Sequence, residues 1–118
     1  RRSNKERIQK ALETIPGVRV VNERPEAETS WFGVPTVCED NNLKRSLVAY
    51  LEENKIQTRN YFAGNILLHP GYRDLGKASD YPNANQVLDK VFFLGCSPTI
   101  HEKMLQYIEK VIGNYVSN

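Results

Sequence analysis

The chain has 118 residues, of which 40% are hydrophobic and 25% charged, the composition of an ordinary globular domain. Its 16 basic and 14 acidic residues are interspersed and leave a net charge of +2, so we expect no nucleic-acid partner. No apolar run approaches the roughly 18 residues of a membrane span, and no signal peptide is visible. We therefore expect a cytoplasmic protein without a membrane partner.

The two cysteines and two histidines do not indicate a metal site. Cys38, Cys96, His69 and His101 lack the CxxC or HxxxH spacing of zinc ligands. Because cytosolic proteins rarely keep disulfides, we expect two reduced and partly buried thiols.

The first third of the chain predicts a helix and two strands. Ser3 and Glu6 have the spacing of a capping box. An apolar stripe at helical spacing follows: Ile8, Ala11, Leu12 and Ile15. Residues 18–21 and 31–37 are rich in β-branched and aromatic side chains and predict strands. Because proline has no amide hydrogen, Pro35 should place the second strand at a sheet edge or in a bulge.

The rest of the chain predicts three helices and two further strands. Asp40 is a good N-cap for a helix, which a short strand at 56–59 should follow. Residues 85–90 predict a short helix and residues 91–94 a buried strand, and Thr99 begins a second capping box before the last helix. This order predicts an α+β fold with a small, mostly antiparallel sheet and helices packed on one face. Six residues should be buried between helices and sheet: Leu47, Leu51, Phe93, Met104, Ile108 and Val111.

Residues 60–82 have no sustained period but contain three glycines, two prolines and four aromatic residues. Irregular stretches longer than about 12–15 residues are uncommon in compact domains unless they are functional or disordered. The aromatic content argues against disorder. We therefore interpret the segment as one that packs against a surface, which need not belong to this chain.

Where this segment begins, residues 58–65 read TRNYFAGN. The run resembles the T-R-x-x-F-A-G-N motif of the CDP-4-dehydro-6-deoxyglucose 3-dehydratases, which are DegT/DnrJ/EryC1/StrS-type sugar enzymes. Aminotransferases of that family usually carry an H-Y-x-P-L-H run there. Further matches lie at residues 31–35, 70–72 and 93–98, so the resemblance covers nearly the whole chain.

The resemblance implies the small C-terminal domain of the type I pyridoxal-phosphate-dependent transferase fold. Residues 1–118 would then be a single domain and the C-terminal fragment of a longer enzyme. Pyridoxamine or pyridoxal 5′-phosphate would be bound mainly by a large N-terminal domain, which also carries the catalytic lysine or the histidine in its place. No catalytic residue is therefore expected in this chain, which should be inactive alone. The implied substrate is a nucleotide-linked 4-keto-6-deoxy sugar that loses its C3 hydroxyl in dideoxysugar and lipopolysaccharide biosynthesis. Implied partners are the large domain, a second copy in a homodimer and, for some members, a reductase.

The resemblance also selects residues that would face the sugar or cofactor: Arg59, Tyr61, Phe62, Asn65 and His69. Arg59 could clamp a phosphate or form a surface salt bridge. Tyr61 and Phe62 could line a sugar pocket or pack in the core. Asn65 could reach the sugar or cap its own backbone, and the segment from Arg59 to Tyr72 would turn towards the active site.

Two other functions stay open. The domain could belong to a pyridoxal-phosphate-dependent sugar aminotransferase, which transfers nitrogen and does not eliminate water. Lysine at the Schiff-base position would favour transamination, and histidine would favour dehydration. Alternatively, the chain could be a stand-alone α+β binding module without a catalytic parent.

Overall fold

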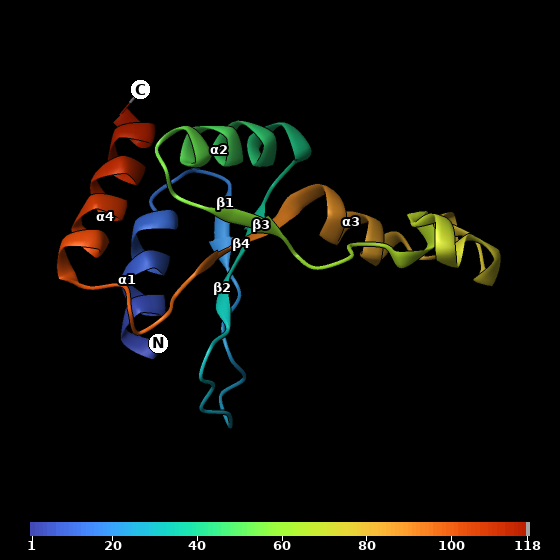
Figure 1. Cartoon of the computed structure of the whole chain (residues 1–118), viewed down its shortest axis with the longest axis horizontal. Helices are drawn as coiled ribbons and strands as arrows, with labels where there is room; N and C mark the ends of the chain where they lie inside the picture. Colours follow the sequence, from blue (N-terminus) through green and yellow to red (C-terminus); the bar gives the residue numbers. More distant parts are fainter. Residues whose placement is uncertain (118) are drawn as a thin grey trace.

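A computed structural model describes residues 1–117, so Asn118, the last residue of the expected domain, lies outside the description. Its sheet has four antiparallel strands in the order β1-β2-β4-β3 (Figure 1). The strands are β1 (Val18–Val20), β2 (Gly33–Cys38), β3 (Thr58–Asn60) and β4 (Val91–Gly95). The α-helices are α1 (Arg2–Leu12), α2 (Asn41–Glu53), α3 (Pro82–Lys90) and α4 (Glu102–Ser117). The predicted α+β class and antiparallel sheet are confirmed.

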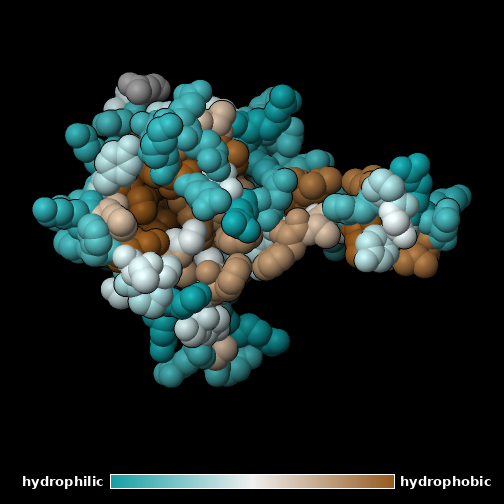
Figure 2. Space-filling view, in the orientation of Figure 1, coloured by the Kyte–Doolittle hydropathy of each residue, from teal (hydrophilic) through white to brown (hydrophobic). Residues whose placement is uncertain are grey.

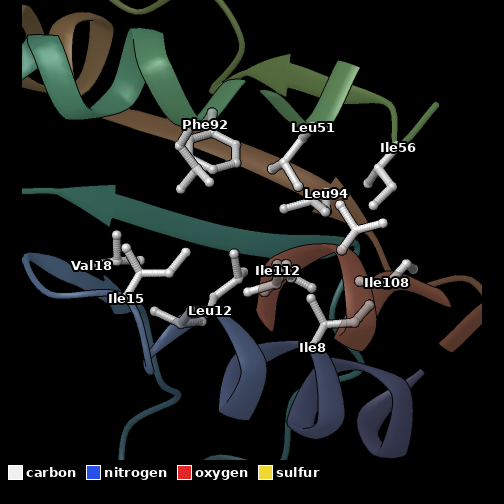
Figure 3. Close-up of a cluster of buried hydrophobic side chains, with 14 of the residues drawn as sticks. Ile8, Leu12, Ile15, Val18, Leu51, Ile56, Phe92, Leu94, Ile108 and Ile112 are labelled. Carbon is white, nitrogen blue, oxygen red and sulfur yellow. The ribbon is translucent and has the colours of Figure 1, made fainter. Parts of the chain in front are cut away.

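Helices α1, α2 and α4 cover one face of the sheet. Apolar side chains of these helices converge with those of the strands in one core (Figure 3). Its largest fully buried side chains include Ile8, Leu12, Leu47, Leu51, Phe92, Leu94 and Ile112. Their spacing of three or four residues along each helix, and of two along β4, explains why these segments fold as they do.

The opposite face of the sheet, here called the open face, is not covered by these three helices. Alternation along the strands places on it Arg19, Gly33, Pro35, Val37, Arg59, Val91, Phe93 and Gly95. Its central strands are therefore apolar on both sides, a pattern typical of a sheet with both faces buried.

Between β3 and α3 the chain leaves the sheet as an arm, defined here as residues 61–81. The arm projects away from the body (Figure 1) and contains three short 3-10 helices, η1 (Ile66–Leu68), η2 (Pro70–Leu75) and η3 (Ala78–Asp80). This confirms the prediction of an irregular segment. No helix among residues 1–117 has the length and apolar character needed to cross a bilayer.

Local capping signals were only partly informative. The Asp40 carboxylate accepts a hydrogen bond from the Leu43 amide at 2.8 Å, which confirms the predicted cap of α2. Ser3 lies inside α1, because the helix already begins at Arg2, and no side chain caps it. The second capping box is also wrong, because α4 begins only at Glu102 and the Thr99 hydroxyl bonds to that of Ser97.

The prediction that Pro35 marks an edge or a bulge is wrong, because β2 lies between β1 and β4. The Pro35 carbonyl accepts a bond from the Val21 amide, one residue beyond the end of β1. The amide and carbonyl of a strand residue point to the same side, so the proline nitrogen faces the position where β1 has already ended. The proline therefore removes a single bond, to the Val21 carbonyl at the very end of the β1–β2 pairing, and it leaves the β2–β4 pairing intact, so an interior strand can contain it at small cost.

Two core predictions need correction. Met104 is 48% exposed, and Leu105 is buried in its place, because the stripe of α4 that packs into the core, mainly against α1, is rotated by one residue. Phe93 is buried, but on the open face, since it alternates with the core residues Phe92 and Leu94. The predicted burial of Leu47, Leu51, Ile108 and Val111 is confirmed.

Candidate functional site

Four aromatic rings form a cluster on the open face: Phe32, Tyr61, Phe62 and Phe93. The Phe93 ring is the centre, with centroids 5.7 Å from Phe62, 5.8 Å from Phe32 and 6.0 Å from Tyr61. Phe93 is 8% exposed, whereas Phe32 and Phe62 are each 67% exposed. Large exposed apolar side chains that cluster in this way mark surfaces that bind something.

Backbone geometry positions the cluster. Gly33 lies beneath the Phe93 ring, and a Cβ atom at Gly33 would approach Phe93 Cδ2 to 2.5 Å. Phe62 has a φ of 55°, a left-handed conformation that is unusual for a bulky residue, and its amide donates to the Asn60 carbonyl at 2.7 Å. The tight turn after β3 therefore directs the Phe62 ring back onto the sheet.

Shallow hollows adjoin the aromatic rings. One of about 190 Å³ is lined by Phe32, Phe93, Arg59, Gln57 and Gly95, so an arginine and two aromatic residues share one hollow. A second of about 70 Å³ lies among Phe32, Tyr61, Phe62 and Phe93, and a third of about 300 Å³ separates Tyr61 from α3. Rings beside one cation suit a ligand with an apolar or ring-shaped body and an anionic group.

Asn65 lies inside the arm and is 2% exposed. Its carbonyl oxygen accepts from the Leu67 amide at 3.0 Å, and its amide donates to Ala78 O at 3.2 Å and Asn85 Oδ1 at 2.8 Å. These bonds join the start of the arm to its end and to α3. A sugar-contacting role for Asn65 stays a prediction, and it would require these bonds to open.

His69, which lies farther along the arm, is exposed, and its Nε2 lies 3.1 Å from the Ala63 carbonyl. Neither His69 nor Asn65 lines the hollows of the open face. The structure therefore brings Arg59, Tyr61 and Phe62 together at the open face and leaves Asn65 and His69 farther along the arm, away from it.

Phe32 and Phe93 belong to the cluster but were not among the predicted site residues. The run Val91-Phe92-Phe93-Leu94 contained the signal, since a strand that is apolar at every position has something to bury on both faces. The sequence did not indicate which face the helices would leave uncovered.

The base of the arm is held by a buried lysine. The Lys44 ammonium, on α2, donates to Asn60 Oδ1 at 3.0 Å and to the Leu88 carbonyl at 2.6 Å. The Lys44 ammonium therefore joins the two ends of the arm. Asn60 is the last residue of β3 before the arm, and Leu88 lies in α3, which follows the arm. Burial lowers the pKa of Lys44 and raises the pKa of the nearby Cys38 thiol to about 11.

The fold is shared with a segment of several longer proteins of known structure. DesV of S. venezuelae superposes with a TM-score of 0.85 over 99% of this chain and 31% of DesV, at 15% sequence identity. The aminotransferase TlmJ of Streptoalloteichus hindustanus superposes with a TM-score of 0.79 over 98% of this chain and 30% of TlmJ, at 19% identity. An E. coli GDP-4-keto-6-deoxy-D-mannose-3-dehydratase gives 0.72 over 94% of this chain and 29% of its own, at 22% identity. The chain thus has the fold of a domain of these enzymes.

The chain belongs to the DegT/DnrJ/EryC1/StrS aminotransferase family, whose model matches residues 1–112. It is 33% identical to the dTDP-4-dehydro-2,6-dideoxy-D-glucose 3-dehydratase of Saccharopolyspora spinosa, over 99% of this chain and 26% of that enzyme. It is 35% identical to the lipopolysaccharide biosynthesis protein RfbH of Salmonella typhimurium, over 73% of this chain and 22% of RfbH. The family resemblance of the TRNYFAGN motif is confirmed. The chain spans about a quarter of the length of these curated relatives.

Proposed function

We propose that this chain is the small C-terminal domain of a pyridoxamine- or pyridoxal-phosphate-dependent nucleotide-sugar 3-dehydratase. The reaction would remove the C3 hydroxyl of a nucleotide-linked 4-keto-6-deoxyhexose in dideoxysugar or lipopolysaccharide biosynthesis. The observation that carries the proposal is the 33% identity along 99% of the chain to a sugar 3-dehydratase. The motif at 58–65, which resembles that of the sugar 3-dehydratases, supports it.

The residues of this chain do not fit a cofactor site of their own. The hollows of about 70 and 190 Å³ among the rings are not lined by a lysine that could form a Schiff base. Lys90 lines the third hollow, of about 300 Å³, but Tyr61 is the one aromatic ring in that lining. The cofactor, whose ring accepts electrons released at the sugar, would therefore be bound by the large domain. This chain alone is expected to be inactive.

The role we propose for the open face is to close one side of the active site. The rings of Tyr61 and Phe62 would contact the apolar side of the sugar and exclude water, and Arg59 would bind a phosphate of the nucleotide. Their position beside one another on the open face supports this role. We assign Asn65 to holding the arm in shape, with His69 farther along the same arm.

A sugar aminotransferase is the second candidate, because the family whose model matches residues 1–112 is described as an aminotransferase family. One residue distinguishes the aminotransferase from the dehydratase, namely the residue at the Schiff-base position of the polypeptide that carries this domain. Lysine there would indicate transamination, and histidine would indicate dehydration. We further propose that the whole enzyme is a cytoplasmic homodimer, and that a reductase serves it if it is a dehydratase.

A chimera tests the role of the domain. Residues 1–117 would replace the aligned segment of the Saccharopolyspora spinosa dehydratase, and loss of the C3 hydroxyl would be followed by mass spectrometry. We expect activity in the chimera, a fall of at least tenfold with Phe62→Ala or Arg59→Ala, and little change with the control Arg45→Ala on the exposed side of α2. Unchanged turnover in both site variants would refute the proposed role of the open face.

The isolated chain provides a second test. We expect no saturable change in absorbance near the pyridoxal band when pyridoxal phosphate is added. Stoichiometric, saturable binding would contradict the assignment of cofactor binding to another domain.

A further inference from the structure

A cavity of about 480 Å³ lies next to the proposed sugar site and shares Gln57 and Gly95 with the 190 Å³ hollow of the open face. It lies between the end of α2, the end of β4 and the first half of α4, and is called here the α4 groove. Figure 2 shows a hollow with hydrophobic side chains on its floor in this part of the surface. Its apolar lining consists of Ile56, Leu94, Ile100, Met104 and Ile108.

The groove arises because the apolar stripe of α4 is wider than the core needs. Met104 is 48% exposed and Tyr107 is 46% exposed, although both follow the helical spacing of the buried residues. The Tyr107 hydroxyl donates to the Asn54 carbonyl at 2.8 Å, which fixes the ring as a wall of the groove. An apolar concavity of this size, within the roughly 300–1,000 Å³ of small-molecule sites, is a candidate binding site.

The polar residues around this apolar floor are selectively basic. Lys55, His101 and Lys103 line the groove, and no acidic residue does. Among residues 1–117, none of the three forms a salt bridge. An anionic group could therefore bind there without displacing a carboxylate of the protein.

Lys55 adds an independent observation. It has a φ of 65°, and the bonds Lys55 N to Glu52 O (3.0 Å) and Ile56 N to Leu51 O (2.9 Å) close the C-terminus of α2 around it. This left-handed position is where glycine usually ends a helix, because a side chain there is strained. The chain thus has a strained lysine at the groove, although glycine would give the more stable turn.

We propose that the α4 groove binds a small amphipathic anion, an aliphatic carboxylate of medium chain length. The alkyl chain would contact the floor formed by Met104 and Ile108, and the carboxylate would bind the ammonium groups of Lys55 and Lys103. The volume fits one small molecule, which favours this ligand over a peptide helix that would need an extended groove. The proposal does not rest on the proposed sugar site, although the two share Gln57 and Gly95, and its test measures no catalytic activity.

Titration of the chain with decanoate, below its micelle-forming concentration, tests the proposal. Backbone amide shifts should change at residues 55–57 and 100–108 and saturate. Affinity for decanoate should exceed that for acetate, which lacks the alkyl chain, and for decanol, which lacks the charge, by at least tenfold. Equal affinities for the three, or shifts located elsewhere, would overturn the proposal, as would binding of an acidic peptide without binding of decanoate.

Variants separate a binding role of Lys55 from a structural one. Lys55→Gly should raise the melting temperature by about 2–5 °C, because the strain is removed. The same change should weaken decanoate binding about three- to fivefold, as should Lys103→Ala. Lys110→Ala, at an exposed position of α4 outside the groove, is the control and should leave affinity unchanged. Unchanged affinity in both groove variants would show that the charges do not bind the ligand.

Discussion

Replacement of Lys44 by methionine should release the arm while leaving the body folded. The Lys44 side chain is 7% exposed, and its ammonium joins Asn60, at the end of β3, to Leu88 in α3. Methionine keeps most of the packed stem but donates no hydrogen bond. The change therefore tests the connection at the base of the arm with little disturbance of the core.

The expected magnitude follows from two opposing effects. Loss of the ammonium leaves the Asn60 side-chain oxygen and the Leu88 carbonyl without this donor, which costs about 1–3 kcal/mol. Removing a buried charge recovers part of this, since burial already lowers the pKa of Lys44. A net cost of about 1–2 kcal/mol, confined to the base of the arm, corresponds to amide exchange about 5- to 30-fold faster in the arm.

Hydrogen exchange measured by mass spectrometry can follow this in peptides covering residues 61–90 and, for comparison, residues 102–112. Lys5→Met is the matched control, because Lys5 is also buried and its ammonium bonds to Gln9 and Asn22, outside the arm. Lys44→Met should accelerate exchange in the arm alone, and Lys5→Met should not. Equal acceleration in both regions, or none in the arm, would refute a local role for Lys44.

Three further predictions concern the core, the arm and a thiol. Ile108→Ala should destabilise the fold by about 2–5 kcal/mol in urea unfolding, because Ile108 belongs to the buried cluster; a loss below about 0.5 kcal/mol would contradict its burial. In the unmodified chain, backbone amides of residues 60–80 should exchange with solvent faster than those of residues 91–94 and 100–112, because the arm has few contacts with the body. Comparable protection in the two regions would show that the arm is packed. Burial raises the pKa of the Cys38 thiol from 9.0 to about 11. The contribution of the protonated thiol to the free energy of unfolding is therefore complete below pH 9 and decreases as the pH rises towards 11. This loss of unfolding free energy should reach about 2–3 kcal/mol in the parent chain and be absent in Cys38→Ala. Identical dependence of stability on pH in the two proteins would contradict the prediction.

Several elements could be predicted because their signals are local. The Asp40 cap, the apolar spacing of α2 and the apolar run of β4 each depend on residues close in sequence. The capping boxes at Ser3 and Thr99 failed for a related reason. The same residue pattern can bond within a turn or lie inside a helix, and the neighbouring chain decides which.

The sequence alone was sufficient for the α+β class, the irregular segment and the family, because these follow from hydrophobic period, composition and the motif at 58–65. Only the tertiary structure decided which face of the sheet remained open, since the strand order β1-β2-β4-β3 pairs residues far apart in the chain. That order placed Phe93 in the aromatic cluster and Pro35 in an interior strand. It also determined that Asn65 bonds within the arm and that Met104 lines a groove, because burial depends on neighbours that no local pattern specifies.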